Sequence, residues 1–176
     1  MLRSKVFILA FALLAFQSTE GAESEQIEKI MEIFYLKPEM RSAYDTVKVE
    51  AGQAKISIWR DLPPNPLPDK VECLGYEWLL TGRGQHIGKG VRKVFEQLPS
   101  IQSVELSLVE LSFKTKSGDG KGKIEKQTEA KTYLKLKVDR AKVLSSAPLE
   151  KMEVFQDLQK CLGLGRQMVS QREINL

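Results

Sequence analysis

One short stretch, residues 81–90 (TGRGQHIGKG), concentrates the residue types that most often do chemistry. It contains four glycines and His86, the only histidine in the chain. A glycine-rich loop that opens onto a helix can surround a phosphate group with backbone N–H groups. The stretch therefore raises three alternatives: a phosphate-binding loop, a catalytic loop, or a flexible turn that leads into a helix.

The spacing of the glycines argues against a nucleotide-binding P-loop. That loop needs G-x-x-x-x-G-K-[ST], in which the lysine reaches the phosphates and the hydroxyl holds magnesium. Gly82 lies one position too far from Gly88, Gly84 lies one too near, and Gly90 stands where the hydroxyl should be. A simpler anion or ligand contact at a helix N-terminus remains, and the competing interpretation is a solvated, charged helix face. The residues predicted for this contact are Arg83, His86, Lys89, Arg92 and Lys93.

The rest of the chain gives little support to catalysis or metal binding. His86 has an ordinary pKa near neutrality, but no nucleophile elbow of the form G-x-S-x-G accompanies it. Zinc sites need several Cys or His residues at short spacing, and this chain has two widely separated cysteines and one histidine. We therefore predict no catalytic residue, no metal and no cofactor. A hydrolase-like enzyme that uses His86 is the alternative.

The N-terminus has the three-part pattern of a secretory signal peptide. Arg3 and Lys5 precede an uncharged apolar run, residues 6–16, and a polar stretch with small residues follows. The run is too short to span a bilayer, which takes about 20 apolar residues. We predict that residues 1–22 are removed, with the cut after Gly21 or Ala22. The alternative is an uncleaved helix close to a membrane.

An exported chain works in the periplasm or outside the cell, and this placement changes the interpretation of its cysteines and its charge. In an oxidising compartment the pair Cys73 and Cys161 predicts one disulfide. The chain is mildly basic, with 27 Lys and Arg residues against 23 Asp and Glu residues. This balance is compatible with contact to an envelope protein or to an anionic polymer or lipid surface. The sequence shows no run of basic residues interleaved with aromatic residues, so we predict no nucleic acid partner. We also predict no transmembrane span in the mature chain.

Residues 23–69 predict a helix, a hairpin and a connector. Apolar positions repeat with helical spacing over residues 23–37. The segments TVKVE (46–50) and KISIW (55–59) alternate apolar and polar residues around a turn that contains glycine, which predicts a β-hairpin. Residues 62–70 are rich in proline and predict an irregular connector.

Residues 70–176 predict a second set of elements. The alternation of Leu74, Tyr76, Trp78 and Leu80 predicts a strand, whose aromatic residues belong to the core or, alternatively, form a carbohydrate-stacking surface. A change of phase between Leu108 and Val109 predicts a β-bulge. The full set is a strand at 71–80, a helix at 87–98, strands at 101–114 and 131–144, a helix at 146–162 that ends at Gly163, and a last strand within 166–176.

This succession predicts an α+β fold with an antiparallel sheet and helices on one face. The C-terminal part, residues 70–176, is expected to be ferredoxin-like (split βαβ) and to form one compact unit with the N-terminal helix and hairpin. The predicted function is an exported binding or assembly module of the cell envelope or extracellular space that contacts an anionic surface or ligand through residues 83–93. A subunit of an envelope protein complex is a further alternative.

Overall fold

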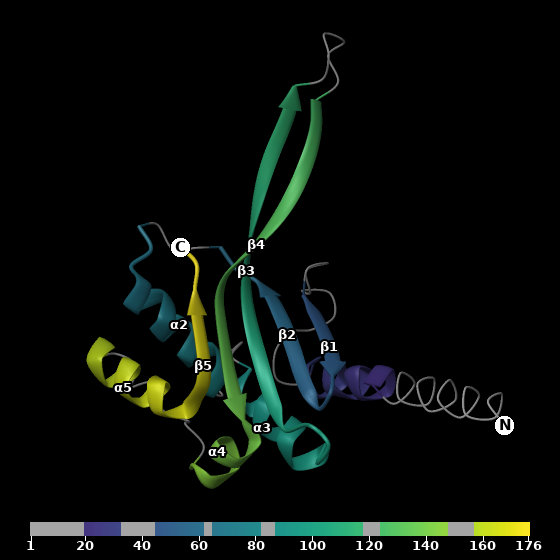
Figure 1. Cartoon of the computed structure of the whole chain (residues 1–176), viewed down its shortest axis with the longest axis vertical. Helices are drawn as coiled ribbons and strands as arrows, with labels where there is room; N and C mark the ends of the chain where they lie inside the picture. Colours follow the sequence, from purple (N-terminus) through teal and green to yellow (C-terminus); the bar gives the residue numbers. More distant parts are fainter. Residues whose placement is uncertain (1–19, 33–44, 62–64, 82–86, 118–123, 148–156) are drawn as a thin grey trace, which may run out of the picture.

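The computed structural model describes residues 20–32, 45–61, 65–81, 87–117, 124–147 and 157–176. Five strands form one sheet in the order β1-β2-β3-β4-β5, and helices pack against it (Figure 1). The predicted α+β class is confirmed. The sheet is mixed rather than antiparallel, because β2 and β3 run parallel to each other.

The predicted hairpin forms the first edge of the sheet. Strand β1 spans Thr46–Glu50, strand β2 spans Gln53–Trp59, and the two pair antiparallel. Their two-residue turn has positive φ angles at Ala51 (48°) and Gly52 (74°), which is the requirement of a type I′ turn. Residues 20–32 are helical, so the helix predicted over residues 23–37 is confirmed for 23–32, and residues 33–37 lie outside the described residues. Ser24 of this helix accepts a hydrogen bond from the backbone N–H of Val49.

Two long strands form the centre of the sheet. Strand β3 spans Ser103–Ser117 and strand β4 spans Ile124–Asp139, and they pair antiparallel. Their register shifts between Leu108 and Val109, so the predicted β-bulge is confirmed. The second strand, predicted at residues 131–144, begins earlier and ends earlier than expected, because its predicted last residues form helix α4, Arg140–Ser145.

The prediction of a strand over residues 71–80 was wrong. Pro68–Leu80 is helix α2, with proline in its first turn and Asp69 close to its N-terminus. Proline fits this position because the first helical N–H groups have no partner within the helix. The helix buries a face with helical spacing, whose members include Val71, Glu72, Gly75, Tyr76 and Leu79.

The remaining elements agree with the sequence in type but not in every boundary. Helix α3 spans Gly88–Gln97, close to its predicted range. Helix α5 spans Leu158–Met168, so Gly163 does not end it, while the predicted helix start near residue 148 lies outside the described residues. Strand β5, Val169–Ile174, follows directly and pairs antiparallel with β4.

The part predicted to be ferredoxin-like, residues 70–176, begins with helix α2 rather than with a strand. A strand–helix–strand–strand–helix–strand succession results only if β2 is counted as the first strand and α2 with α3, and α4 with α5, are each counted as one helical segment. Within the sheet, however, neighbouring strands are consecutive in the chain, and β2 lies directly beside its parallel partner β3. The crossover between these two strands contains α2 and α3.

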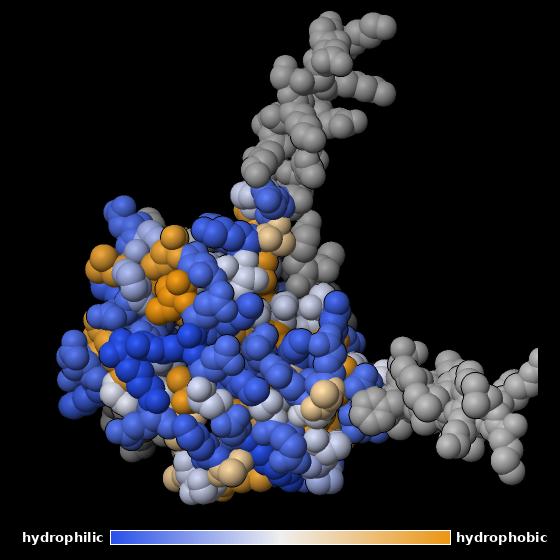
Figure 2. All heavy atoms as spheres, in the orientation of Figure 1, coloured by the Kyte–Doolittle hydropathy of each residue, from blue (hydrophilic) through white to orange (hydrophobic). Residues whose placement is uncertain are grey.

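The helices cover one face of the sheet and the other face is polar. A Cβ atom on Gly75 of α2 would lie 2.2 Å from Leu134 of β4, which shows how closely this helix approaches the sheet. On the opposite face Lys55, Glu105 and Lys137 stand side by side across β2, β3 and β4. Hydrophilic residues accordingly cover most of the sheet face seen in Figure 2.

Beyond the sheet, β3 and β4 continue as a two-stranded arm. Strand β2 follows β3 only to Val109, and β5 follows β4 only from Leu134 to Val138. The pairs from Glu110↔Lys131 to Ser117↔Ile124 therefore have no third strand beside them among the described residues. Figure 1 shows this arm, residues 110–117 and 124–131, projecting away from the body of the protein.

Candidate functional site

The predicted anion contact is only partly within the described residues. Arg83 and His86 lie outside them. The base of their loop is closed, because the Gly88 N–H donates to the Thr81 carbonyl (2.9 Å) and the Ile87 N–H donates to the Trp78 carbonyl (2.9 Å). A Cβ atom at Gly88 would lie 2.4 Å from the Thr81 oxygen, so glycine is required where the two ends of the loop meet.

The three described residues of this contact have different surroundings. Arg92 donates from its guanidinium to the carbonyl oxygens of Val143 (2.7 Å) and Ser146, at the end of α4. Lys93 forms an ion pair with Glu96 at 3.3 Å, and Lys89 is exposed. Arg92 therefore has a structural role, since its hydrogen bonds attach the end of α4 to α3.

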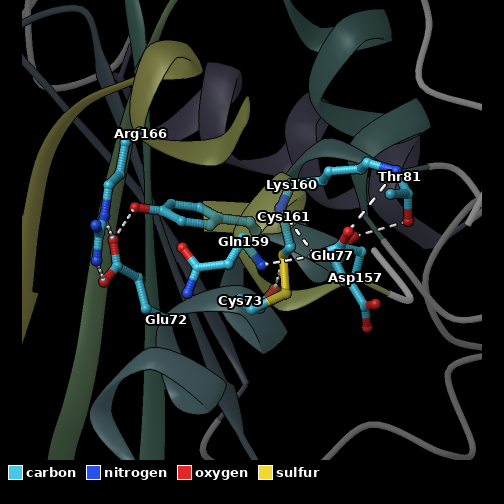
Figure 3. The surroundings of a disulfide bond; sticks show 10 residues. Glu72, Cys73, Glu77, Thr81, Asp157, Gln159, Lys160, Cys161 and Arg166 are labelled. Atoms are coloured by element: carbon cyan, nitrogen blue, oxygen red, sulfur yellow. Dashed lines mark hydrogen bonds and ion pairs between the residues drawn. A yellow bond between two sulfur atoms is a disulfide. The ribbon is translucent and has the colours of Figure 1, made fainter. Parts of the chain in front are cut away.

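Cys73 and Cys161 form a disulfide in the structure (Figure 3). The two Cα atoms are 5.8 Å apart, which is an ordinary separation for this bond. Alternation along a strand would turn Cys73 away from the helices. Because residues 68–80 are instead a helix, Cys73 lies on the side of α2 that packs against α5.

Beside the disulfide lies a buried carboxylate surrounded by donors (Figure 3). Glu72 is 1% exposed and accepts two hydrogen bonds from Arg166 of α5, from Nε and from Nη2, both at 2.8 Å. Arg172 of β5 donates to it through Nη1 at 2.6 Å, and the Tyr76 hydroxyl also donates to it. This arrangement satisfies both carboxylate oxygens and links α2 to α5 and β5.

The surroundings fix the protonation of this cluster. Burial alone would raise the pKa of Glu72, but hydrogen bonds from Arg166, Tyr76 and Arg172 outweigh it and lower the pKa to about 2. Burial and the bond to Glu72 raise the pKa of the Tyr76 hydroxyl above its ordinary value. Glu72 is therefore ionised and Tyr76 neutral near pH 7. Neither group is suited to proton transfer there.

The sequence analysis did not identify the Glu72 cluster. Glu72 and Tyr76 lie in α2, whereas the two arginines lie in α5 and β5, 94 and 100 positions beyond Glu72 in the chain, so no local pattern connects the carboxylate with its arginines. One signal was present, since Glu72 and Tyr76 have the i, i+4 spacing of neighbours on a helix. In the strand predicted for residues 71–80, residues four positions apart are not neighbours, so the prediction gave no reason to connect Glu72 with Tyr76. Tyr76 and Trp78 are both buried, so they do not form an exposed carbohydrate-stacking surface.

Within the described ranges, no group of three or more His, Cys, Asp or Glu residues could hold a metal ion. None of the helices in those ranges is both long enough and apolar enough to cross a membrane. No protein-family model matches the chain, and no curated protein and no solved structure matches it either.

Proposed function

We propose that this chain is an exported binding or assembly module of the cell envelope or extracellular space, which engages a partner protein through its β3–β4 arm. The export part of the proposal comes from the N-terminal signal pattern, and a disulfide between buried cysteines is compatible with an oxidising compartment. The proposal that the chain engages a partner protein rests on the arm.

The observation that carries the proposal is the length of the arm beyond its sheet. Eight register pairs, from Glu110↔Lys131 to Ser117↔Ile124, correspond to about 27 Å of strand. A two-stranded hairpin alone is marginally stable in water, and sheets generally need three strands or a packed face. An arm of this length is therefore expected to gain stability from a partner.

The chemistry of the arm favours a partner that supplies a β-strand. Each strand of the arm has an outer edge with no neighbouring strand among the described residues. The N–H and C=O groups of such an edge are available for pairing with an extended segment of another protein. Backbone hydrogen bonds would then provide the affinity, and side chains on alternate positions the specificity.

A shortened arm tests this function directly. Leu111 and Ala130 are register partners, so residues 112–129 can be replaced by Asn-Gly, which forms a two-residue hairpin turn. We expect this variant to unfold at nearly the same urea concentration as the wild type but to lose its cross-linked partners in the native envelope fraction. The control variant, Lys55→Ala with Lys137→Ala on the polar sheet face, should keep them.

Hydrogen exchange provides a second readout on the purified complex. Amide groups of residues 110–117 and 124–131 should exchange quickly in the free protein and slowly once the partner is bound. If the shortened variant retained the same partners, or if these amides were not protected in the complex, the arm would not be the contact and the proposal would fail.

A further inference from the structure

We propose that Arg166 and Arg172 form a binding site for a phosphate-type oxyanion, in the hollow between α5 and β5. The hollow has a volume of about 230 Å³ and opens to solvent beside the edge strand. Its lining consists of Arg166, Val169, Ser170, Gln171 and Arg172. This site is distinct from the arm and does not depend on the function proposed above.

Both guanidinium groups retain donors for a ligand. A guanidinium has five N–H donors. Within the described part of the chain, Arg172 uses only Nη1, on Glu72, and Arg166 uses Nε and Nη2, on Glu72 and Asp69. The side chains of Arg166 and Arg172 are 43% and 47% exposed. Their remaining N–H groups can thus reach solvent or a bound anion.

The buried carboxylate fixes the positions of these donors. Glu72 holds Arg166 at two points and Arg172 at one, so both arginines converge on one side chain. The next residue, Cys73, is covalently bonded to Cys161 of α5. Gly165 allows α5 to lie against Tyr76, because a Cβ atom there would be 2.0 Å from the tyrosine ring. A ligand would therefore meet donors that are already ordered, which reduces the entropy lost on binding.

The type of ligand follows from this geometry and the local charge. Glu72 offsets one of the two positive charges, and Asp69, whose side chain is 56% exposed, lies 3.5 Å from Arg166. Attraction over long distances is therefore weak, and affinity must come from hydrogen bonds at short range. Planar guanidinium groups match oxyanions in paired bonds, and a phosphate offers enough oxygens for two of them at once. The source is either a free phosphate group or the headgroup of a phospholipid.

Titration with two probes tests the site. The full chain, expressed from Met1 and recovered in its native form, is titrated by calorimetry with inorganic phosphate at constant ionic strength. It is then mixed with vesicles of phosphatidylglycerol and phosphatidylcholine, and with vesicles of phosphatidylcholine alone. Binding of phosphate identifies a free phosphate group as sufficient, whereas binding of the anionic vesicles alone identifies a lipid headgroup.

Variants separate binding from folding. Arg172→Gln should weaken binding of the effective probe at least tenfold, and Arg172→Lys, which retains charge but not the planar fork, should weaken it too. The control is Lys160→Gln on the same helix, since Lys160 is 72% exposed and has no bond to Glu72. It should bind like the wild type. If neither probe binds the wild type, or if Arg172→Lys and Lys160→Gln bind equally well, the site does not exist.

Discussion

Arg166 and Glu72, which are 94 positions apart in the chain, form a two-point ion pair between α5 and α2, with both N–O distances at 2.8 Å. The carboxylate is almost completely buried, whereas the guanidinium lies at the surface. One side chain of α2 thus bonds to helix α5 through Arg166 and to strand β5 through Arg172.

The substitution Glu72→Gln should lower the free energy of unfolding by about 3 kcal/mol at pH 7, because it removes the buried charge with which both Arg166 and Arg172 pair and leaves only Asp69 near Arg166. The pKa of Glu72 is depressed from 4.5 to about 2 in the folded protein. Its contribution to stability is therefore complete above about pH 5 and is lost as the pH falls toward 2. In urea unfolding, the difference in stability between wild type and variant should be nearly the same at pH 7 and pH 5 and clearly smaller at pH 3.

A surface carboxylate provides the control for this series. Glu96 pairs with Lys93 at 3.3 Å, and both side chains are well exposed. Such pairs contribute about 0–1 kcal/mol, so Glu96→Gln should change stability little at any of the three pH values. A difference between wild type and Glu72→Gln that is the same at pH 7 and pH 3 would contradict the role given to the Glu72 charge.

Loss of the disulfide should destabilise the fold strongly. The bond joins residues separated by 88 positions, and closing a loop of that length contributes about 4.5 kcal/mol in the chain-entropy model. The double variant Cys73→Ala with Cys161→Ala should unfold at a much lower urea concentration than the wild type. Adding a reductant should lower the urea midpoint of the wild type and leave that of the double variant unchanged. An identical response of the two proteins would show that the bond is absent in solution.

Two glycines of α5 should respond in opposite directions to the same change. Gly165→Ala would place a methyl group 2.0 Å from the buried ring of Tyr76, so we expect a loss of about 1–3 kcal/mol. Gly163 is exposed with no atom within 4 Å of an added Cβ, so Gly163→Ala should stabilise the helix by up to about 1 kcal/mol. Thermal unfolding of both variants measures the contrast. Equal effects would mean that α5 does not pack on Tyr76 as described.

Tyr133 should make the stability of the fold sensitive to high pH. It is fully buried, its hydroxyl has no hydrogen-bond partner among the described residues, and burial raises its pKa to about 12. Since the ordinary value is about 10, stability should be complete below pH 10 and decrease as the pH rises from 10 to 12. Tyr133→Phe should leave stability at pH 7 unchanged or slightly higher, because it removes an unpaired hydroxyl.

Unfolding curves at pH 8, 10 and 11, with tyrosinate absorbance followed in parallel, test this expectation. The phenylalanine variant should lose less stability over that range than the wild type. A tyrosine that ionised near pH 10 in the folded protein, or an equal loss in both proteins, would refute it.

Much of the sheet could be predicted from the sequence because its signals are local. The alternation of TVKVE and KISIW around Ala51 and Gly52 specifies a hairpin without reference to any other part of the chain. The change of apolar phase at Leu108 and Val109 likewise predicts the bulge. In each case the pattern repeats within the segment that adopts the structure.

Helix α2 shows why other features could not be predicted in this way. Tyr76 and Trp78 fit a strand of period two, yet Tyr76 also belongs with Glu72, Val71, Gly75 and Leu79 to a helical face. A run of ten mostly apolar residues satisfies both patterns, and its packing on β4 and α5 decides between them. The local signals for a helix were Pro68 at its start and the i, i+4 spacing of Glu72 and Tyr76. Because the segment was predicted to be a strand, Glu72 and Tyr76 were not expected on one face. The arginines of the cluster lie in distant elements and gave no local signal either.

The position of the disulfide has a consequence for biosynthesis. Cys73 is synthesised 88 positions before its partner Cys161, so its thiol exists before the second sulfur does. Any product that stops before residue 161 therefore has a thiol at position 73 that cannot form this bond. The covalent link thus marks molecules that contain both α2 and α5, and a free thiol at position 73 distinguishes fragments from them.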